Sequence, residues 1–120
     1  MEWWRRFFLA VDRKDISDLG DWFSTDLELQ FGNWPRVMGK DAALVVLEQF
    51  FGSIDGLSHQ LIGAVSQEAR IVVESIVTYR RLDGSSVSLP AATLLERDGE
   101  RIKHLRIYVD QSPLFAPAAA

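Results

Sequence analysis

The spacing of apolar residues changes at about residue 56, and this change restricts the fold more than any other feature of the chain. Before it, apolar residues recur every three or four positions or alternate briefly, which predicts helices over 3–13, 16–23 and 39–51 and a short strand over 27–31. After it, apolar and polar residues alternate, which predicts strands at about 57–65, 70–82, 86–97 and 101–110. Asp15 is the expected N-cap of the second helix, and Asp83-Gly84 is the expected hairpin turn. Helices followed by hairpin-connected strands predict an α+β fold, with the helices packed on one face of a curved antiparallel sheet of about five strands.

The composition narrows the class of protein further. A chain of 120 residues fits one domain, which we place at 1–115, followed by a frayed tail over 116–120. The chain has no cysteine and only two histidines, so we expect no disulfide, no metal and no cofactor. The 17 acidic and 13 basic residues give a net charge of −4, which disfavours nucleic acid as a partner. No apolar run reaches the roughly 20 residues of a membrane span and no secretory signal is visible, so we expect a cytoplasmic protein with no membrane partner.

Four short motifs, taken in their order along the chain, resemble those of one known family. They are Trp22-Phe23-Ser24-Thr25-Asp26, Gly39-Lys40-Asp41-Ala42, Leu82-Asp83-Gly84 running into Leu89-Pro90-Ala91-Ala92-Thr93, and Arg106-Ile107-Tyr108-Val109-Asp110 with Ser112-Pro113-Leu114 after it. Through them nearly the whole chain resembles the nuclear transport factor 2-like superfamily. Within it, the chain is similar to the SnoaL-like polyketide cyclases and the ketosteroid isomerase-related branch. This resemblance implies a cystatin-like cone, in which a curved sheet and three N-terminal helices enclose one deep pocket.

The resemblance also indicates where catalytic groups would lie, and this chain carries other residues there. The general base of the isomerases would fall near Phe31 and their oxyanion acid near Thr93. The arginine and aspartate of the epoxide hydrolases would fall near Ser75 and Val77, and the acid–base aspartate of the cyclases near Ile107. Phenylalanine, valine and isoleucine cannot transfer protons, so we expect the standard carboxylates to be missing and disfavour an epoxide hydrolase.

We expect the pocket to be lined mainly by apolar side chains. The candidates are Phe7, Trp22, Phe31, Trp34, Ser75, Val77, Thr93, Leu105, Ile107 and Val109. Such a lining suits a small apolar organic ligand that a few polar groups orient. Large aromatic side chains are also typical of a hydrophobic core, so for Trp22, Phe31 and Trp34 both interpretations stay open.

Three polar residues are the candidates for catalysis: His59, Tyr79 and Asp110. His59 opens the first long strand, where it is either a general base or a histidine hydrogen-bonded to backbone or water. Tyr79 either presents its hydroxyl to a ligand or lies at the sheet edge with the hydroxyl in water.

The terminal strand, which contains Asp110, has a polar and an apolar face. The polar face comprises His104, Arg106, Tyr108 and Asp110, and the apolar face comprises Leu105, Ile107 and Val109. If the polar face lined the pocket, Asp110 would be a base, Tyr108 a donor and Arg106 an anion clamp. If it covered the outer side of the sheet, as is usual for half-buried strands, the same residues would form a surface or a dimer contact.

These observations predict a protein that binds a small hydrophobic molecule. We expect isomerase, cyclase or dehydratase chemistry without a metal, on a polyketide-, steroid- or terpenoid-like substrate. The alternative is a non-catalytic ligand-binding or dimeric interaction module of the same fold. Val72, Ile76 and Tyr108 give the outer sheet face more apolar surface than a monomer normally exposes, which predicts a homodimer through that face.

Overall fold

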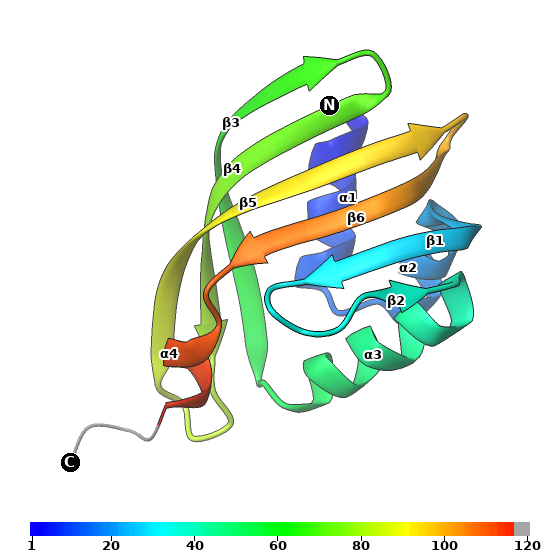
Figure 1. Ribbon diagram of the computed structural model, residues 1–120. Helices are drawn as coiled ribbons and strands as arrows, with labels where there is room; N and C mark the ends of the chain where they lie inside the picture. The colour runs from blue at the N-terminus through cyan, green and yellow to red at the C-terminus, as the bar shows by residue number, and fades with distance from the viewer. Residues whose placement is uncertain (117–120) are drawn as a thin grey trace.

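The computed structural model describes residues 1–116, which form four helices and six strands (Figure 1). The helices are α1 (Trp3–Asp12), α2 (Ile16–Trp22), α3 (Lys40–Gly52) and the short α4 (Ser112–Phe115). The strands are β1 (Phe23–Phe31), β2 (Val37–Met38), β3 (Gly56–Gln67), β4 (Arg70–Arg80), β5 (Ser86–Asp98) and β6 (Arg101–Val109). The predicted α+β class is confirmed. Residues 117–120, part of the predicted frayed tail, lie outside the described residues.

All six strands belong to one sheet, in the order β2-β1-β6-β5-β4-β3. Strands β3 to β6 follow one another as antiparallel hairpins, whereas β1 pairs in parallel with β6, Leu29 opposite Leu105 and Phe31 opposite Ile107. Gly84 has a φ of +89° in the turn between β4 and β5, a conformation that glycine adopts without steric cost. The predicted Asp83-Gly84 turn is therefore confirmed.

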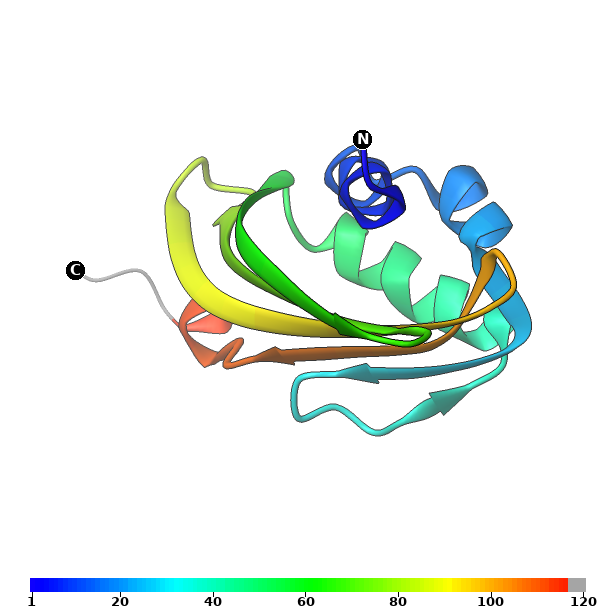
Figure 2. The same cartoon turned by 90° about the horizontal axis from the view of Figure 1, so that it is seen from above.

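The sheet is strongly curved, and α1, α2 and α3 lie on its concave side (Figure 2). Register shifts between Leu61 and Gly63 on β3 and between Glu96 and Arg97 on β5 increase the local bend, as bulges do. The helices therefore close one side of a half-open cone, as the predicted cone requires.

The hydrophobic core lies between the concave face and the helices. Strand β4 alternates strictly and buries Ile71, Val73, Ser75, Val77 and Tyr79. Helix α1 contributes Trp4, Phe7, Phe8 and Ala10 to the same core. Asp15 accepts a hydrogen bond from the Asp18 backbone N–H at 3.0 Å and so caps α2, as predicted.

Three features differ from the expected elements. Strand β1 begins at Phe23, four residues earlier than predicted, because this fully buried residue pairs with Ile102 of β6. The two-residue β2 pairs with Glu28 and Leu29 and raises the strand count to six. The short α4 was not expected. Within residues 1–116, no helix has both the length and the apolar composition needed to cross a membrane.

Candidate functional site

A small cavity lies between the helices and the concave sheet face, at the place where the cone would hold a ligand. Its volume is about 40 Å³, far below the roughly 300–1,000 Å³ of typical small-molecule pockets. Seven of its lining side chains are aromatic: Phe7, Phe8, Phe23, Phe31, Phe50, Phe51 and Tyr79. The remainder are Val11, Leu19, Leu47, Leu57, His59, Thr93, Leu105 and Ile107. We call this space the inner cavity.

The inner cavity is small because aromatic rings occupy the space that the curved sheet encloses. Phe50 of α3 lies at the centre of these rings, with ring centroids 4.8 Å from Phe31 and 5.6 Å from Tyr79. Phe7 of α1 lies 6.2 Å from Phe23. These separations are those of favourable aromatic pairs. The rings therefore act as core, although they stand where a ligand pocket is expected.

His59 and Asp12 form a hydrogen-bonded pair at the wall of the inner cavity. The His59 Nδ1 lies 2.6 Å from Asp12 Oδ1, and the His59 backbone N–H donates to Asp12 Oδ2 at 3.1 Å. The pair is largely shielded, with side-chain exposures of 10% for His59 and 21% for Asp12. Because the carboxylate can only accept, it holds the proton on Nδ1 and leaves Nε2 as a basic nitrogen.

His59 also reaches a second hollow, of about 250 Å³, on the outside of the molecule. Phe8 and His59 line both this hollow and the inner cavity, and their rings pack 4.8 Å apart. These two rings therefore separate the inner cavity from the outer hollow.

Tyr79 is the other titratable group of the inner cavity. Its side chain is only 3% exposed, and its position opposite Leu57 places it on the same sheet face as His59. Burial raises the pKa of Tyr79 to about 12, and the negative charge of Asp12 contributes. The phenol therefore remains protonated at neutral pH and can act as a hydrogen-bond donor.

The structure brings seven of the thirteen predicted site residues together in the inner cavity. They are Phe7, Phe31, His59, Tyr79, Thr93, Leu105 and Ile107. Ser75 and Val77 are buried on the same sheet face without lining the cavity, and the Ser75 hydroxyl has no hydrogen-bond partner within the described part of the chain. Val109 is half-buried on the apolar face of β6.

Trp22, Trp34 and Asp110 lie elsewhere. Trp34, in the loop before β2, is 36% exposed and packs on Phe31 at 5.1 Å. Trp22 lines a separate surface groove. Asp110 is exposed and accepts hydrogen bonds from Ser112, which hold the pKa of its carboxyl below the usual range.

The polar face of β6 covers the outside of the sheet. Arg106 donates to Glu28 at 3.3 Å, and Tyr108 is 56% exposed. His104 lies between two carboxylates, with Nδ1 2.7 Å from Glu96 and Nε2 3.6 Å from Glu28. The sequence left open whether this polar face lines the pocket or covers the outer side of the sheet, and the structure has it on the outer side.

Asp12 is the residue of this site that the sequence pattern did not single out. A carboxylate in the last turn of a helix interacts unfavourably with the helix dipole. This position of Asp12 indicates that its side chain is stabilised by a partner outside the helix. Among residues 1–116, no three His, Asp or Glu side chains are grouped as a metal site would require.

Comparison with known structures places the fold among the nuclear transport factor 2-like proteins. An NTF2-like protein of unknown function from Burkholderia pseudomallei has a TM-score of 0.82 at 14% identity, over 92% of this chain and 90% of that chain. An LEH-like epoxide hydrolase from M. tuberculosis has a TM-score of 0.77 at 19% identity, over 91% and 80%. A protein from Catenulispora acidiphila with a ketosteroid isomerase-like fold, in complex with trimethylamine, has a TM-score of 0.76 at 17% identity, over 85% of this chain and 80% of that chain. At these identities the likeness establishes the fold alone.

The SnoaL-like domain family matches residues 4–105, most of the chain. The chain therefore belongs to the SnoaL-like family. A comparison with curated protein sequences gave no significant match.

Proposed function

We propose that the protein binds a small, mostly apolar organic molecule beside His59 and transfers a proton on it, as an isomerase, cyclase or dehydratase does. The observation that carries this proposal is the Asp12–His59 hydrogen-bonded pair, whose imidazole lines the inner cavity. An acid–base group against an apolar lining is typical of a catalytic site. It supplies a base beside Phe31 and Ile107, near which the resemblance places the carboxylates of the isomerases and cyclases.

The chemistry follows from the orientation of the imidazole. With Nδ1–H donated to Asp12, the Nε2 of His59 accepts a proton from a carbon next to a carbonyl group, and Asp12 stabilises the imidazolium. The Tyr79 hydroxyl donates to the oxyanion that forms on the substrate. Return of the proton from Nε2 to another carbon completes an isomerisation.

The size of the substrate is restricted by the aromatic rings. An apolar cavity of about 150 Å³ accommodates benzene, so the inner cavity, at about 40 Å³, must widen before an organic molecule enters. Rotation of Phe8 would join the cavity to the outer hollow that the same ring lines. We therefore propose a substrate with a single ring, of small polyketide- or terpenoid-like type, rather than a steroid.

The test is the isomerisation of 3-cyclohexenone to the conjugated 2-cyclohexenone, followed by ultraviolet absorbance. The parent protein should accelerate it, His59→Gln should lower the rate at least 100-fold, and Asp12→Asn should lower it less. His104→Gln, which changes the other histidine on the outer face, is the matched control and should leave the rate unchanged. A parent protein without turnover, or a His59→Gln variant as active as the parent, would exclude His59 as the base.

A non-catalytic ligand-binding or interaction module is the second candidate, and the filling of the inner cavity by seven aromatic rings favours it. On this alternative the Asp12–His59 pair is structural. Binding of cyclohexenone, detected by calorimetry in both the parent and His59→Gln with no turnover in either, would support this module.

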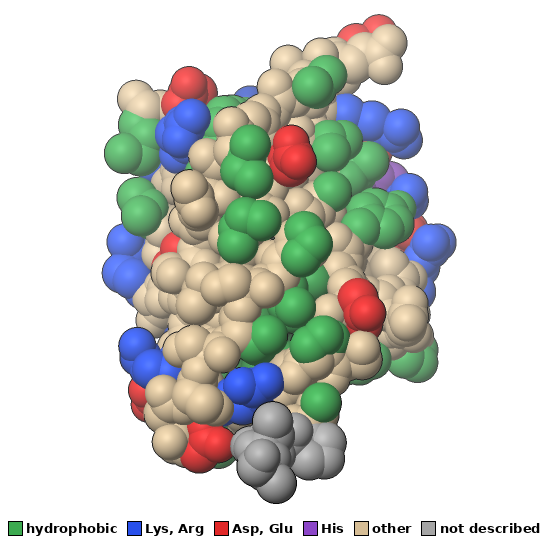
Figure 3. Space-filling view, turned by 90° about the vertical axis from the view of Figure 1, so that its left-hand side faces the viewer, with side chains coloured by type: hydrophobic (Ala, Val, Ile, Leu, Met, Phe, Trp, Pro, Cys, Tyr) green, Lys and Arg blue, Asp and Glu red, His purple; other side chains and the backbone are tan. Residues whose placement is uncertain are grey.

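We further propose that the protein is a homodimer through the convex sheet face. Outward apolar residues are neighbours there, with Val72 opposite Leu94 and Ile76 opposite Pro90, and Figure 3 shows apolar side chains gathered over the bent side of the sheet. Light scattering should give twice the 13.6 kDa of one chain, and Ile76→Glu should give the monomer mass. Val45→Glu, at an exposed position of α3, is the control and should remain dimeric.

A further inference from the structure

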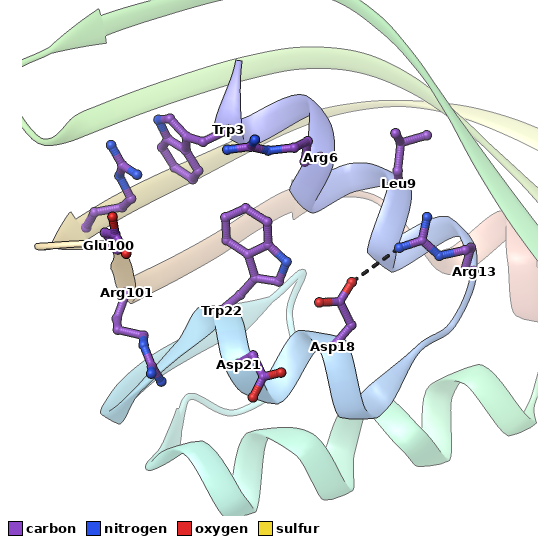
Figure 4. A pocket seen from close by; sticks show the side chains of 10 residues that line it. Trp3, Arg6, Leu9, Arg13, Asp18, Asp21, Trp22, Glu100 and Arg101 are labelled. Carbon is purple, nitrogen blue, oxygen red and sulfur yellow. Dashed lines mark hydrogen bonds and ion pairs between the residues drawn. The ribbon is translucent and has the colours of Figure 1, made fainter. Parts of the chain in front are cut away.

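A third hollow, larger than the two described above, lies on the outside of the molecule, where α1 and α2 meet the end of β5 and the start of β6 (Figure 4). Its volume is about 630 Å³, within the range of small-molecule sites. We call it the Arg–Trp groove, after Trp3, Trp22, Arg6, Arg97 and Arg101, which line it. It is separate from the inner cavity, because the Trp22 ring packs on Phe7 at 5.9 Å and stands between the two spaces.

The groove offers two indole rings to a ligand. Trp3 of α1 and Trp22 of α2 have ring centroids 6.3 Å apart and are both only half-buried. In Figure 4 the Trp22 ring stands in the middle of the groove, below Trp3 and Arg6. Half-buried indoles that face an open hollow provide flat apolar surface for stacking.

The cationic side chains of the groove are all arginines. Arg13 forms an ion pair with Asp18 at 3.2 Å and is neutralised by it. Within residues 1–116, Arg6, Arg97 and Arg101 form no ion pair with a carboxylate, although Asp21 and Glu100 line the same groove. Three guanidinium groups therefore stand against two carboxylates, on a chain whose net charge is −4.

Arg97 packs on one of the two indole rings of the groove. Its guanidinium lies over the Trp3 ring, 4.1 Å from the centroid. A guanidinium in such an arrangement uses its face for the ring and keeps in-plane N–H groups free to donate. Carboxylates and phosphates accept two such bonds in parallel, which lysine cannot offer in the same fixed geometry.

We propose that the Arg–Trp groove binds a planar aromatic anion. The ring system of the ligand stacks against Trp22 and Trp3, and its carboxylate or phosphate group accepts hydrogen bonds from Arg97, Arg6 and Arg101. The acidic net charge of the chain disfavours an extended nucleic acid as the ligand of this groove. This site is independent of the chemistry proposed for His59.

The test is calorimetric titration of the full chain with three probes of one shape. They are 2-naphthoate, 2-naphthyl phosphate and the neutral 2-naphthamide. Both anions should bind with submillimolar Kd at low salt, and the amide at least tenfold more weakly. The tighter anion identifies the charged group of the ligand. Raising the salt concentration should weaken the anions and leave the amide unchanged.

Variants locate the site. Arg6→Gln with Arg101→Gln should weaken naphthoate at least tenfold, whereas Arg36→Gln with Arg80→Gln, an equal change of charge outside the groove, should leave its Kd unchanged. Arg97→Lys retains the charge and should still weaken binding several-fold. His59→Gln should bind naphthoate like the parent, which separates this proposal from the one for His59. Equal affinity for the anions and the amide, or affinity unaffected by the arginine changes, would overturn the proposal.

Discussion

The inner cavity and the Arg–Trp groove differ in almost every physical respect, although helix α1 borders both. The inner cavity has a volume of about 40 Å³ and an apolar lining, whereas the Arg–Trp groove has about 630 Å³ and a charged one. Helix α1 turns Phe7 and Phe8 toward the cavity and Trp3 and Arg6 toward the groove. The curved sheet thus supplies an enclosed space, but side-chain volume decides whether it stays open. The fold alone is a poor guide to where such a protein binds a ligand.

The largest expected effect is the loss of stability when an aromatic ring is removed from the inner cavity, which tests whether the rings keep this cavity closed. Phe50→Ala should destabilise the fold by about 3–5 kcal/mol, because the ring is 3% exposed and contacts Phe31 and Tyr79. Benzene should raise the melting temperature of the variant by filling the new space. The measurement is thermal unfolding with and without benzene.

Val45→Ala is the control for this change. Val45 lies on the same helix but is 53% exposed, so its truncation should change stability by less than about 0.5 kcal/mol. A Phe50→Ala variant as stable as the parent would mean that the rings do not form a tightly packed core.

A smaller effect is expected from the phenol of the inner cavity at high pH. The raised pKa of Tyr79, about 12 against 10.0 in the unfolded chain, means that the folded state holds this proton more tightly. The contribution of the Tyr79 phenol to the free energy of unfolding is complete below pH 10. This contribution falls by about 1.4 kcal/mol per pH unit between pH 10 and 12. Urea unfolding of the parent and of Tyr79→Phe across this range should show the difference. Parallel pH profiles of the two proteins would contradict a shielded phenol.

The smallest effects compare two neighbouring residues: Asp12, which holds His59 at the wall of the inner cavity, and Arg13, which lines the Arg–Trp groove. Asp12→Ala should cost about 1.5–3 kcal/mol, because His59 loses two hydrogen bonds in a shielded place. Arg13→Gln should cost less than about 0.5 kcal/mol, because its ion pair with Asp18 is exposed to solvent. Chemical denaturation measures both. Equal costs would remove the distinction between a shielded and a solvated pair.

Most of the fold was predictable from local patterns. Alternation in β4, the Asp15 cap and the Asp83-Gly84 turn each depend on residues close in sequence, and each is as expected. The start of β1 was not predictable, because the polar residues 24–26 interrupt the alternation and the pairing of Phe23 with β6 is a long-range contact. The two-residue β2 is likewise defined only by the strand beside it.

The candidate site was predictable only in part. Strand alternation made His59 and Tyr79 candidates without deciding whether they face the pocket. Asp12 lies 47 residues away from His59, a separation over which spacing carries no information. The volume of the inner cavity depends on how seven rings pack, which periodicity does not determine. Trp22 has an indole face in the Arg–Trp groove rather than in the cavity, because α2 ends at this residue.

The position of β6 between β1 and β5 has a consequence for the order in which the protein is assembled. During synthesis, β1 leaves the ribosome long before the strand that becomes its parallel neighbour. Until β6 has been made, β1 and β5 each present an open edge, and nothing closes the sheet beneath the aromatic rings. Open edges of this kind recruit other strands. We therefore expect nascent chains that stop before residue 101 to aggregate or to need a chaperone, and chains that include β6 to fold without one.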